Sequence, residues 1–133
     1  MLKDKQSFLD DEQVRSAVKK YLTEDTTVER ACFILKDGTV RPFNNTARTP
    51  INRIAADPES MSEFAKHYFN DDVFGWAHSH PHWAARPSVE DVTCHEYCLH
   101  MIIYSVRDNE FGIWSSTEIA AMKNDLTDYL ITK

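Results

Sequence analysis

The chain has 133 residues, of which 42% are hydrophobic and 11% aromatic, so it can bury one sizeable core but is too short for two ordinary domains. We therefore expect a single domain over residues 1–133. The formal net charge of −6, from 15 basic and 21 acidic residues, comes with no basic stripe that could follow a phosphate backbone, which makes nucleic acid a poor candidate partner.

The first third of the chain predicts a helix followed by a β-hairpin. Apolar residues recur at helical spacing from Val14 to Leu22, behind two aspartates that can cap the helix. Ala31 to Leu35 and Thr39 to Phe43 then flank Asp37-Gly38, which is a strong hairpin turn signal.

The middle of the chain predicts helix, strand, loop and helix in that order. Asp57-Pro58 begins a second amphipathic helix that ends near Asn70. Val73 to His78 has the apolar character of a buried strand, and two prolines bracket a loop from Pro81 to Pro87. Ser88 is placed as the N-cap of a helix running to about Leu99.

The last part of the chain predicts two more strands, Met101 to Val106 and Phe111 to Ser116, and a closing helix from about Ile119 to Leu130. Strands interleaved with helices favour an α/β or α+β fold, in which a mixed sheet is flanked by helices.

The most informative segment is His78-Ser79-His80-Pro81, followed by Ser88 and Asp91. Residues two apart on a strand point to the same face, so the imidazoles of His78 and His80 can converge on one ion. Asp91, in the first turn of the next helix, can add a carboxylate. Two histidines and one carboxylate leave the fourth position of a tetrahedral Zn²⁺ open for water, which is typical of a catalytic zinc site.

Each part of this motif also has an ordinary structural interpretation. A His-x-His pair is often found on the surface or in the core without a chemical role. Ser88 followed three residues later by Asp91 is a common pattern at a helix N-terminus. The two parts in strand, loop, helix order are much harder to explain by chance.

With its spacing of seven residues from His80 to Ser88 and two more to Asp91, this motif resembles the signature of the JAMM metallopeptidases, also called MPN+ or JAB domains. That family places a glutamate on an earlier strand, with two residues between it and a glycine, and Glu29 fits this position. Cys32 stands where the family usually has the glycine, which bears on the packing beside Glu29.

The resemblance implies a JAB/MPN-like fold and a zinc-dependent hydrolase that cleaves a peptide or isopeptide bond. It implies that His78, His80 and Asp91 bind the Zn²⁺ and that Glu29 is the general base for the metal-activated water. It also implies that Ser88 stabilises the oxyanion, a role that competes with helix capping.

The overall layout is similar to the short prokaryotic and phage-tail-assembly branch of the family, in which a protein or peptide substrate, including phage tail proteins, is expected. A metal-binding tail assembly module with little turnover and a RadC-like MPN protein are the alternatives. The acidic balance disfavours the DNA contact that the RadC alternative suggests. The sequence leaves the substrate and the oligomeric state open.

Other cysteines and histidines carry less weight. Cys94 and Cys98 lie one helical turn apart and are expected to be reduced core residues, with a second metal site for them and their neighbouring histidines disfavoured. His82 and Trp83 are expected at the rim of the site, and His67 is expected to face solvent. Reduced thiols, with charges that interrupt any apolar run in the first 20 residues, predict a cytoplasmic protein, or a virion tail protein if phage-encoded, with no membrane partner.

Overall fold

The protein is built around one five-stranded mixed sheet in the strand order β2-β1-β3-β4-β5. The structure is a computed structural model that describes residues 1–44, 57–93 and 99–132, with side chains up to residue 126. Among the strand pairs of the described residues, β3–β4 is parallel, whereas β1–β2, β1–β3 and β4–β5 are antiparallel. The elements in chain order are α1 Lys5–Asp10, α2 Glu12–Leu22, β1 Ala31–Leu35, β2 Val40–Phe43, α3 Pro58–Phe69, β3 Val73–His80, α4 Val89–Thr93, β4 His100–Ser105, β5 Glu110–Trp114 and α5 Ser116–Thr132.

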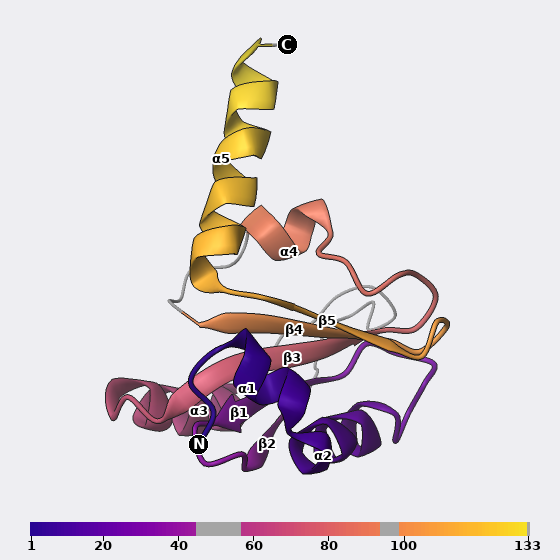
Figure 1. Ribbon diagram of the computed structural model, residues 1–133, viewed down its shortest axis with the longest axis vertical. Coiled ribbons are helices and arrows are strands. Elements are labelled where there is room, and N and C mark those ends of the chain that lie inside the picture. Colours follow the sequence, from indigo (N-terminus) through magenta and orange to yellow (C-terminus); the bar gives the residue numbers. More distant parts are fainter. Residues whose placement is uncertain (45–56, 94–98, 133) are drawn as a thin grey trace.

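One face of the sheet is covered by α1 and α2, which lie together below the strands in Figure 1. Phe8 of α1 stacks on Phe74 of β3, with ring centroids 6.3 Å apart. The core on this face contains Cys32 and Ile34 of β1, packed with apolar side chains of α2. We call this the α2 face.

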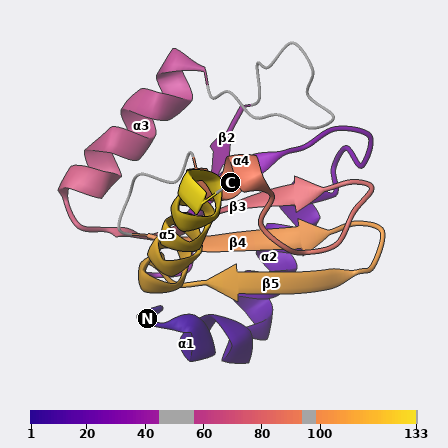
Figure 2. The ribbon, with the colours of Figure 1, turned by 90° about the horizontal axis from the view of Figure 1, so that it is seen from above.

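The opposite face carries α3, α4 and α5, and we call it the α5 face. Figure 2, seen from above, shows α4 and α5 in front of the sheet and α2 behind it. Phe33 of β1 is fully buried against Phe43 and Phe64, with both ring centroids 5.5 Å away. Ile119 at the start of α5 packs on Met101 and on neighbouring residues of β4, while the C-terminal half of α5 rises away from the sheet (Figure 1).

A β-bulge near the start of β3 sets which face each of its later residues occupies. Ile34 pairs with Gly75, but the next residue, Leu35, pairs with Val73, so Phe74 is the extra residue. Val73 and Phe74 pack on opposite faces, in the α5-face and α2-face cores respectively. A Cβ on Gly75 would lie 2.5 Å from the backbone oxygen of His100, so only glycine lets β4 approach this closely.

The predicted mixed sheet with flanking helices is confirmed, with some differences in detail. Helix α1 was not predicted, although Asp4 and Ser7 form a capping box at its start. The helix after Ser88 is described only as Val89–Thr93; residues 94–98 lie outside the described part of the chain, and Leu99 directly precedes β4. The last two strands begin and end one to two residues earlier than predicted. No helix within the described ranges is both long and apolar enough to span a bilayer.

Candidate metal and catalytic site

Strand β3 delivers both histidines to the α5 face. His78 pairs with Ala31 on one side and with Ile103 on the other, and His80 pairs with Ser105 of β4. The two imidazoles have ring centroids 5.0 Å apart, and each residue is only 1% exposed. The prediction that they share one face is confirmed. They lie within β3, of which His80 is the last residue.

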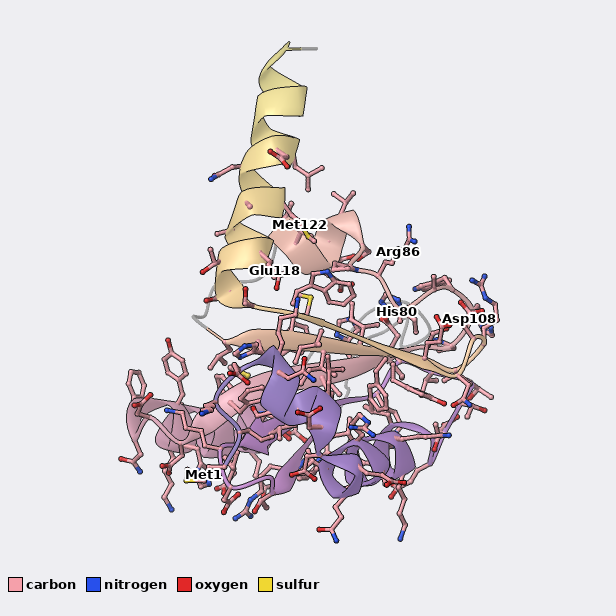
Figure 3. The ribbon with its side chains drawn as sticks, viewed as in Figure 1. Met1, His80, Arg86, Asp108, Glu118 and Met122 are labelled. Carbon is pink, nitrogen blue, oxygen red and sulfur yellow. The ribbon has the colours of Figure 1, made fainter. Side chains whose placement is uncertain are left out.

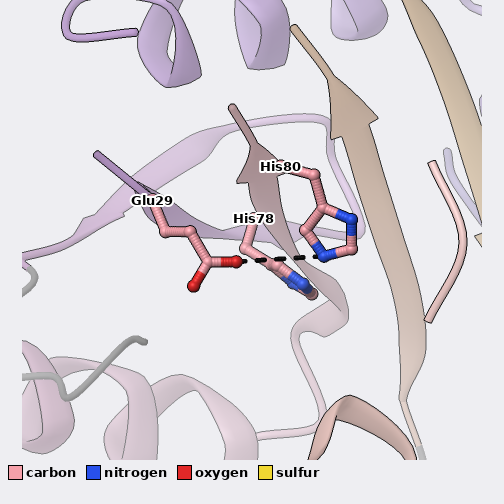
Figure 4. A group of neighbouring side chains, drawn as sticks. All are labelled: Glu29, His78 and His80. Atoms are coloured by element: carbon pink, nitrogen blue, oxygen red, sulfur yellow. Dashed lines mark ion pairs between the residues drawn. The ribbon is translucent and has the colours of Figure 1, made fainter. Parts of the chain in front are cut away.

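Glu29 reaches the site from the segment just before β1 and is 5% exposed. Its Oε1 lies 3.8 Å from Nε2 of His80, and Figure 4 shows its carboxylate directed toward the two rings. The adjacent backbone is fixed by Ser79, which lies between the histidines and faces the other way. The Ser79 N–H donates to the Arg30 carbonyl, and the Arg30 N–H donates to the Ser79 hydroxyl, both at 3.0 Å. The buried centre of β3 therefore holds the chain that carries the glutamate.

Asp91 approaches from the first turn of α4. Its Oδ1 is 3.2 Å from Nε2 of His78 and its Oδ2 is 3.3 Å from Nε2 of His80, so one carboxylate touches both imidazoles. Ser88 fixes this carboxylate in a reciprocal cap, because its N–H donates to Asp91 Oδ2 at 2.9 Å and the Asp91 N–H donates to its hydroxyl at 3.0 Å. The helix cap expected from an ordinary N-terminus and the placement of the motif's carboxylate are therefore produced by the same two hydrogen bonds.

The donor set of this site fits a metal ion. Within the described part of the chain, both ring nitrogens of His78 are buried and are assigned no hydrogen bond, although Nε2 lies 3.2 Å from Asp91 Oδ1. Buried polar atoms without partners are rare and call for an explanation such as an ion. Ligand atoms of Glu29, His78 and His80 lie within 4.8 Å of one another. Two imidazoles and a carboxylate suit Zn²⁺.

The two carboxylates have opposite pKa shifts. Burial raises the pKa of Glu29 to about 7, and the negative charge of Asp91 adds to this effect, although His80 opposes it. Burial also disfavours ionised Asp91, but contacts with His78 and His80 outweigh it and hold the pKa of Asp91 well below its usual range. The pKa of His80 lies above its ordinary value, because its contacts with Asp91 and with the Ala84 carbonyl outweigh burial.

The predicted rim residues are exposed beside the site. Trp83 is 37% exposed and its ring centroid lies 5.9 Å from that of His80, while the side chain of His82 is exposed next to it. Trp76, which was not singled out from the sequence, stacks on His78 with centroids 4.8 Å apart and an interplanar angle of 19°. An aromatic residue two positions before His78, on the same face of the strand, is the sequence signal that predicts this contact.

Three other expectations can be compared with the structure. The prediction that His67 faces solvent is wrong: its side chain is 16% exposed, and its ring nitrogens contact Glu63 at 3.2 Å and Asp72 at 3.4 Å. Cys32, at the family's glycine position, is fully buried on the α2 face, away from the histidines. Cys94 and Cys98 lie outside the described residues, so their packing stays a prediction.

Comparisons with known proteins agree with this fold. Residues 11–120 match the family described as prokaryotic homologs of the JAB domain. The solution structure of protein DSY2949 from Desulfitobacterium hafniense has a similar fold, with a TM-score of 0.55 and 23% identity over 77% of each chain. No curated protein sequence matches the chain significantly. Because the family model covers most of its length, the chain belongs to the prokaryotic homologs of the JAB domain.

Proposed function

We propose that this protein is a zinc-dependent peptidase or isopeptidase. The observation that carries the proposal is the convergence of two buried histidines and two carboxylates, in which the ring nitrogens of His78 have no assigned hydrogen bond among the described residues and Nε2 lies 3.2 Å from Asp91 Oδ1. A purely structural role gives no reason to bury such polar atoms together at the end of a strand, because a buried polar group without a partner costs free energy.

The positions of the two carboxylates support different roles. Asp91 contacts both imidazoles at 3.2 and 3.3 Å, which suits a metal ligand alongside His78 and His80. Glu29 lies further from the imidazoles, with its Oε1 3.8 Å from Nε2 of His80, which suits a base beside the metal. The low pKa of Asp91 and the raised pKa of Glu29 accord with this division, since an efficient proton acceptor has a pKa near the working pH.

A zinc ion held by these residues would lower the pKa of a bound water and polarise the scissile carbonyl. Glu29 then accepts the proton of the attacking water and delivers it to the nitrogen of the leaving amine. Burial of Glu29 keeps its carboxyl out of bulk water, so it can take up the proton near neutral pH.

Ser88 can combine its two proposed roles. In the reciprocal cap its hydroxyl oxygen accepts a hydrogen bond from the Asp91 N–H, which uses a lone pair and not the hydroxyl proton. The hydroxyl proton therefore stays available to donate to the oxygen of the scissile carbonyl as negative charge develops there. Capping and catalysis use different parts of the same group.

Any amide in a protein, peptide or isopeptide linkage can react at such a centre, and phage tail proteins are among the proposed substrates. The alternative, a tail assembly module that holds metal without turnover, uses the same ligands. Metal content alone does not separate these two functions, so the test must measure cleavage.

The test compares the unmodified protein with Glu29→Gln, both loaded with zinc, on a peptide and isopeptide library read by mass spectrometry. Because Glu29 is proposed to move a proton and not to hold the metal, Glu29→Gln should keep about one zinc per chain and lose roughly 10²- to 10⁴-fold in rate. Glu59→Gln is the matched control, since Glu59 is an exposed carboxylate in the first turn of α3 with no proposed role.

Equal rates for Glu29→Gln and the unmodified protein would show that Glu29 is not the base. Zinc binding by the unmodified protein with no cleavage of any library member would favour the assembly module. Absence of zinc after metal loading, at a level matching His78→Ala, would contradict the metal site itself.

A further inference from the structure

The orientation of His80 depends on a backbone carbonyl in the following loop. Nδ1 of His80 lies 2.8 Å from the carbonyl oxygen of Ala84. A carbonyl can only accept a hydrogen bond, so the proton of this contact sits on Nδ1. In neutral His80 this leaves the lone pair on Nε2, the nitrogen that faces Glu29 and Asp91. The loop carrying Ala84 thus selects the tautomer that can bind a metal.

Ser105, the last residue of β4, anchors this loop through a hydrogen bond. It is fully buried, it pairs with His80 in the parallel register, and its hydroxyl donates to the Trp83 carbonyl at 2.8 Å. The same hydroxyl oxygen accepts from the Asp108 N–H at 3.1 Å, so its orientation is fixed on both sides. In Figure 3, His80 and Asp108 are labelled at the same end of the sheet. The carbonyl that Ser105 holds is one peptide unit before the carbonyl that contacts His80.

Gly112 of β5 anchors the loop at a second point. A Cβ at this position would lie 2.5 Å from the backbone oxygen of Ala85 and 2.2 Å from the ring of Trp114. Separations below 3 Å are too short for a Cβ, and the obstacle on one side is backbone, so a larger residue must displace the loop. The missing side chain of Gly112 is what allows the loop to lie directly on β5.

We propose that Ser105 and Gly112 are positioning residues of the metal site, which act through the Ala84 carbonyl on His80. This inference rests on the proposed role of His80 as a zinc ligand. Loss of the Ser105 hydroxyl, or a side chain at position 112, shifts the loop and leaves the His80 ring without its hydrogen-bond acceptor. Neither residue is within the His-x-His-Pro or Ser-x-x-Asp motif, and both come from the C-terminal hairpin of the sheet.

The experiment measures zinc affinity of the full chain by competition with a chromophoric chelator, for the unmodified protein, Ser105→Ala and Gly112→Ala. The control is Ser60→Ala, which removes another buried serine hydroxyl. Ser60 lies on α3, and its hydroxyl accepts a hydrogen bond from the Asn44 N–H at 3.1 Å. We expect both test variants to bind zinc about 10- to 100-fold more weakly, as is typical when a group that orients a ligand histidine is lost, and the control to stay within about threefold. The visible spectrum of the Co²⁺-loaded proteins should change in the test variants only.

Urea unfolding of the metal-free proteins separates positioning from general destabilisation. If Ser105→Ala and Ser60→Ala lose similar stability but only Ser105→Ala loses zinc affinity, the proposal is supported. The proposal is overturned if Ser105→Ala or Gly112→Ala folds and keeps an unchanged zinc affinity and cobalt spectrum. If Ser105→Ala fails to fold, the result for Gly112→Ala decides. If the unmodified protein binds no zinc, the proposed function itself fails, which is a different result from equal affinities.

Discussion

The raised pKa of Glu29 predicts an unusual pH dependence of stability for the metal-free protein. The pKa is about 7 in the folded chain against an ordinary value of 4.5, so the folded state binds an additional proton between these two pH values. Stability is then greatest below pH 4.5 as far as this group is concerned, and it falls as the pH rises through 7. At 1.36 kcal/mol per pH unit, the ionised carboxylate destabilises the fold by about 3 kcal/mol, of which about 2 to 3 kcal/mol should be lost between pH 5 and pH 8.

Substitution of Glu29 by glutamine removes this titration and keeps the shape of the side chain. We expect Glu29→Gln to be more stable than the unmodified protein at pH 8 and to differ much less at pH 5, as measured by urea unfolding with a chelator present. Glu118→Gln is the control. The contact with Lys5 at 2.8 Å lowers the pKa of Glu118, so its ionised carboxylate stabilises the fold, and the substitution should lower the free energy of unfolding at pH 5 and at pH 8 alike. Parallel stability curves for Glu29→Gln and the unmodified protein between pH 5 and pH 8 would refute the reasoning.

Three further predictions follow from contacts described above. Asp91→Ala should lose zinc and activity together, in contrast to Glu29→Gln, because it deletes a proposed ligand; metal analysis and the library assay check this. Burial raises the pKa of Cys32 to about 12 from an ordinary 9.0. Its thiol should therefore react with a disulfide reagent at pH 8 about 10³-fold more slowly in the folded protein than in urea, measured in a variant whose other two cysteines are changed to serine. Phe33→Ala should cost about 3 to 5 kcal/mol in urea unfolding, since Phe33 is fully buried between two other rings, and a cost below 1 kcal/mol would contradict the packing described.

Local signals account for the elements that could be predicted from the sequence. Asp57 caps α3 with Pro58 in its first turn, and Gly38 takes a φ of +91° in the hairpin turn, so local chemistry and final structure agree. The strand that bears the histidines was predicted to end at His78. It continues to His80, because pairing with β4 extends that far along the chain. Pairing between distant segments has no local sequence signal.

The residues of the candidate site that belong to a side-chain motif could be predicted from the sequence. The backbone groups and supporting residues around them could not. His78, His80 and Asp91 have a spacing that strand and helix geometry convert directly into proximity. The Ala84 carbonyl has no such mark, since every residue carries one, and Ser105 becomes relevant only through the β3–β4 register. The contacts of the partly exposed His67 with Glu63 and Asp72 were missed because Asp72 lies on the turn that follows the helix, and its approach to His67 depends on how that turn folds.

The bulge at Phe74 has an evolutionary consequence. If the same residues formed a regular strand without the bulge, alternation from Val73 onward would turn His78 and His80 toward the α2 face, away from Glu29 and Asp91. Deletion of Phe74 would not exchange the faces, because Val73 and Gly75 would keep their partners Leu35 and Ile34 and the strand would become regular. Homologs should therefore either keep the extra residue together with the bulge or lack both, whereas a one-residue change of length between Trp76 and His80 should not be tolerated.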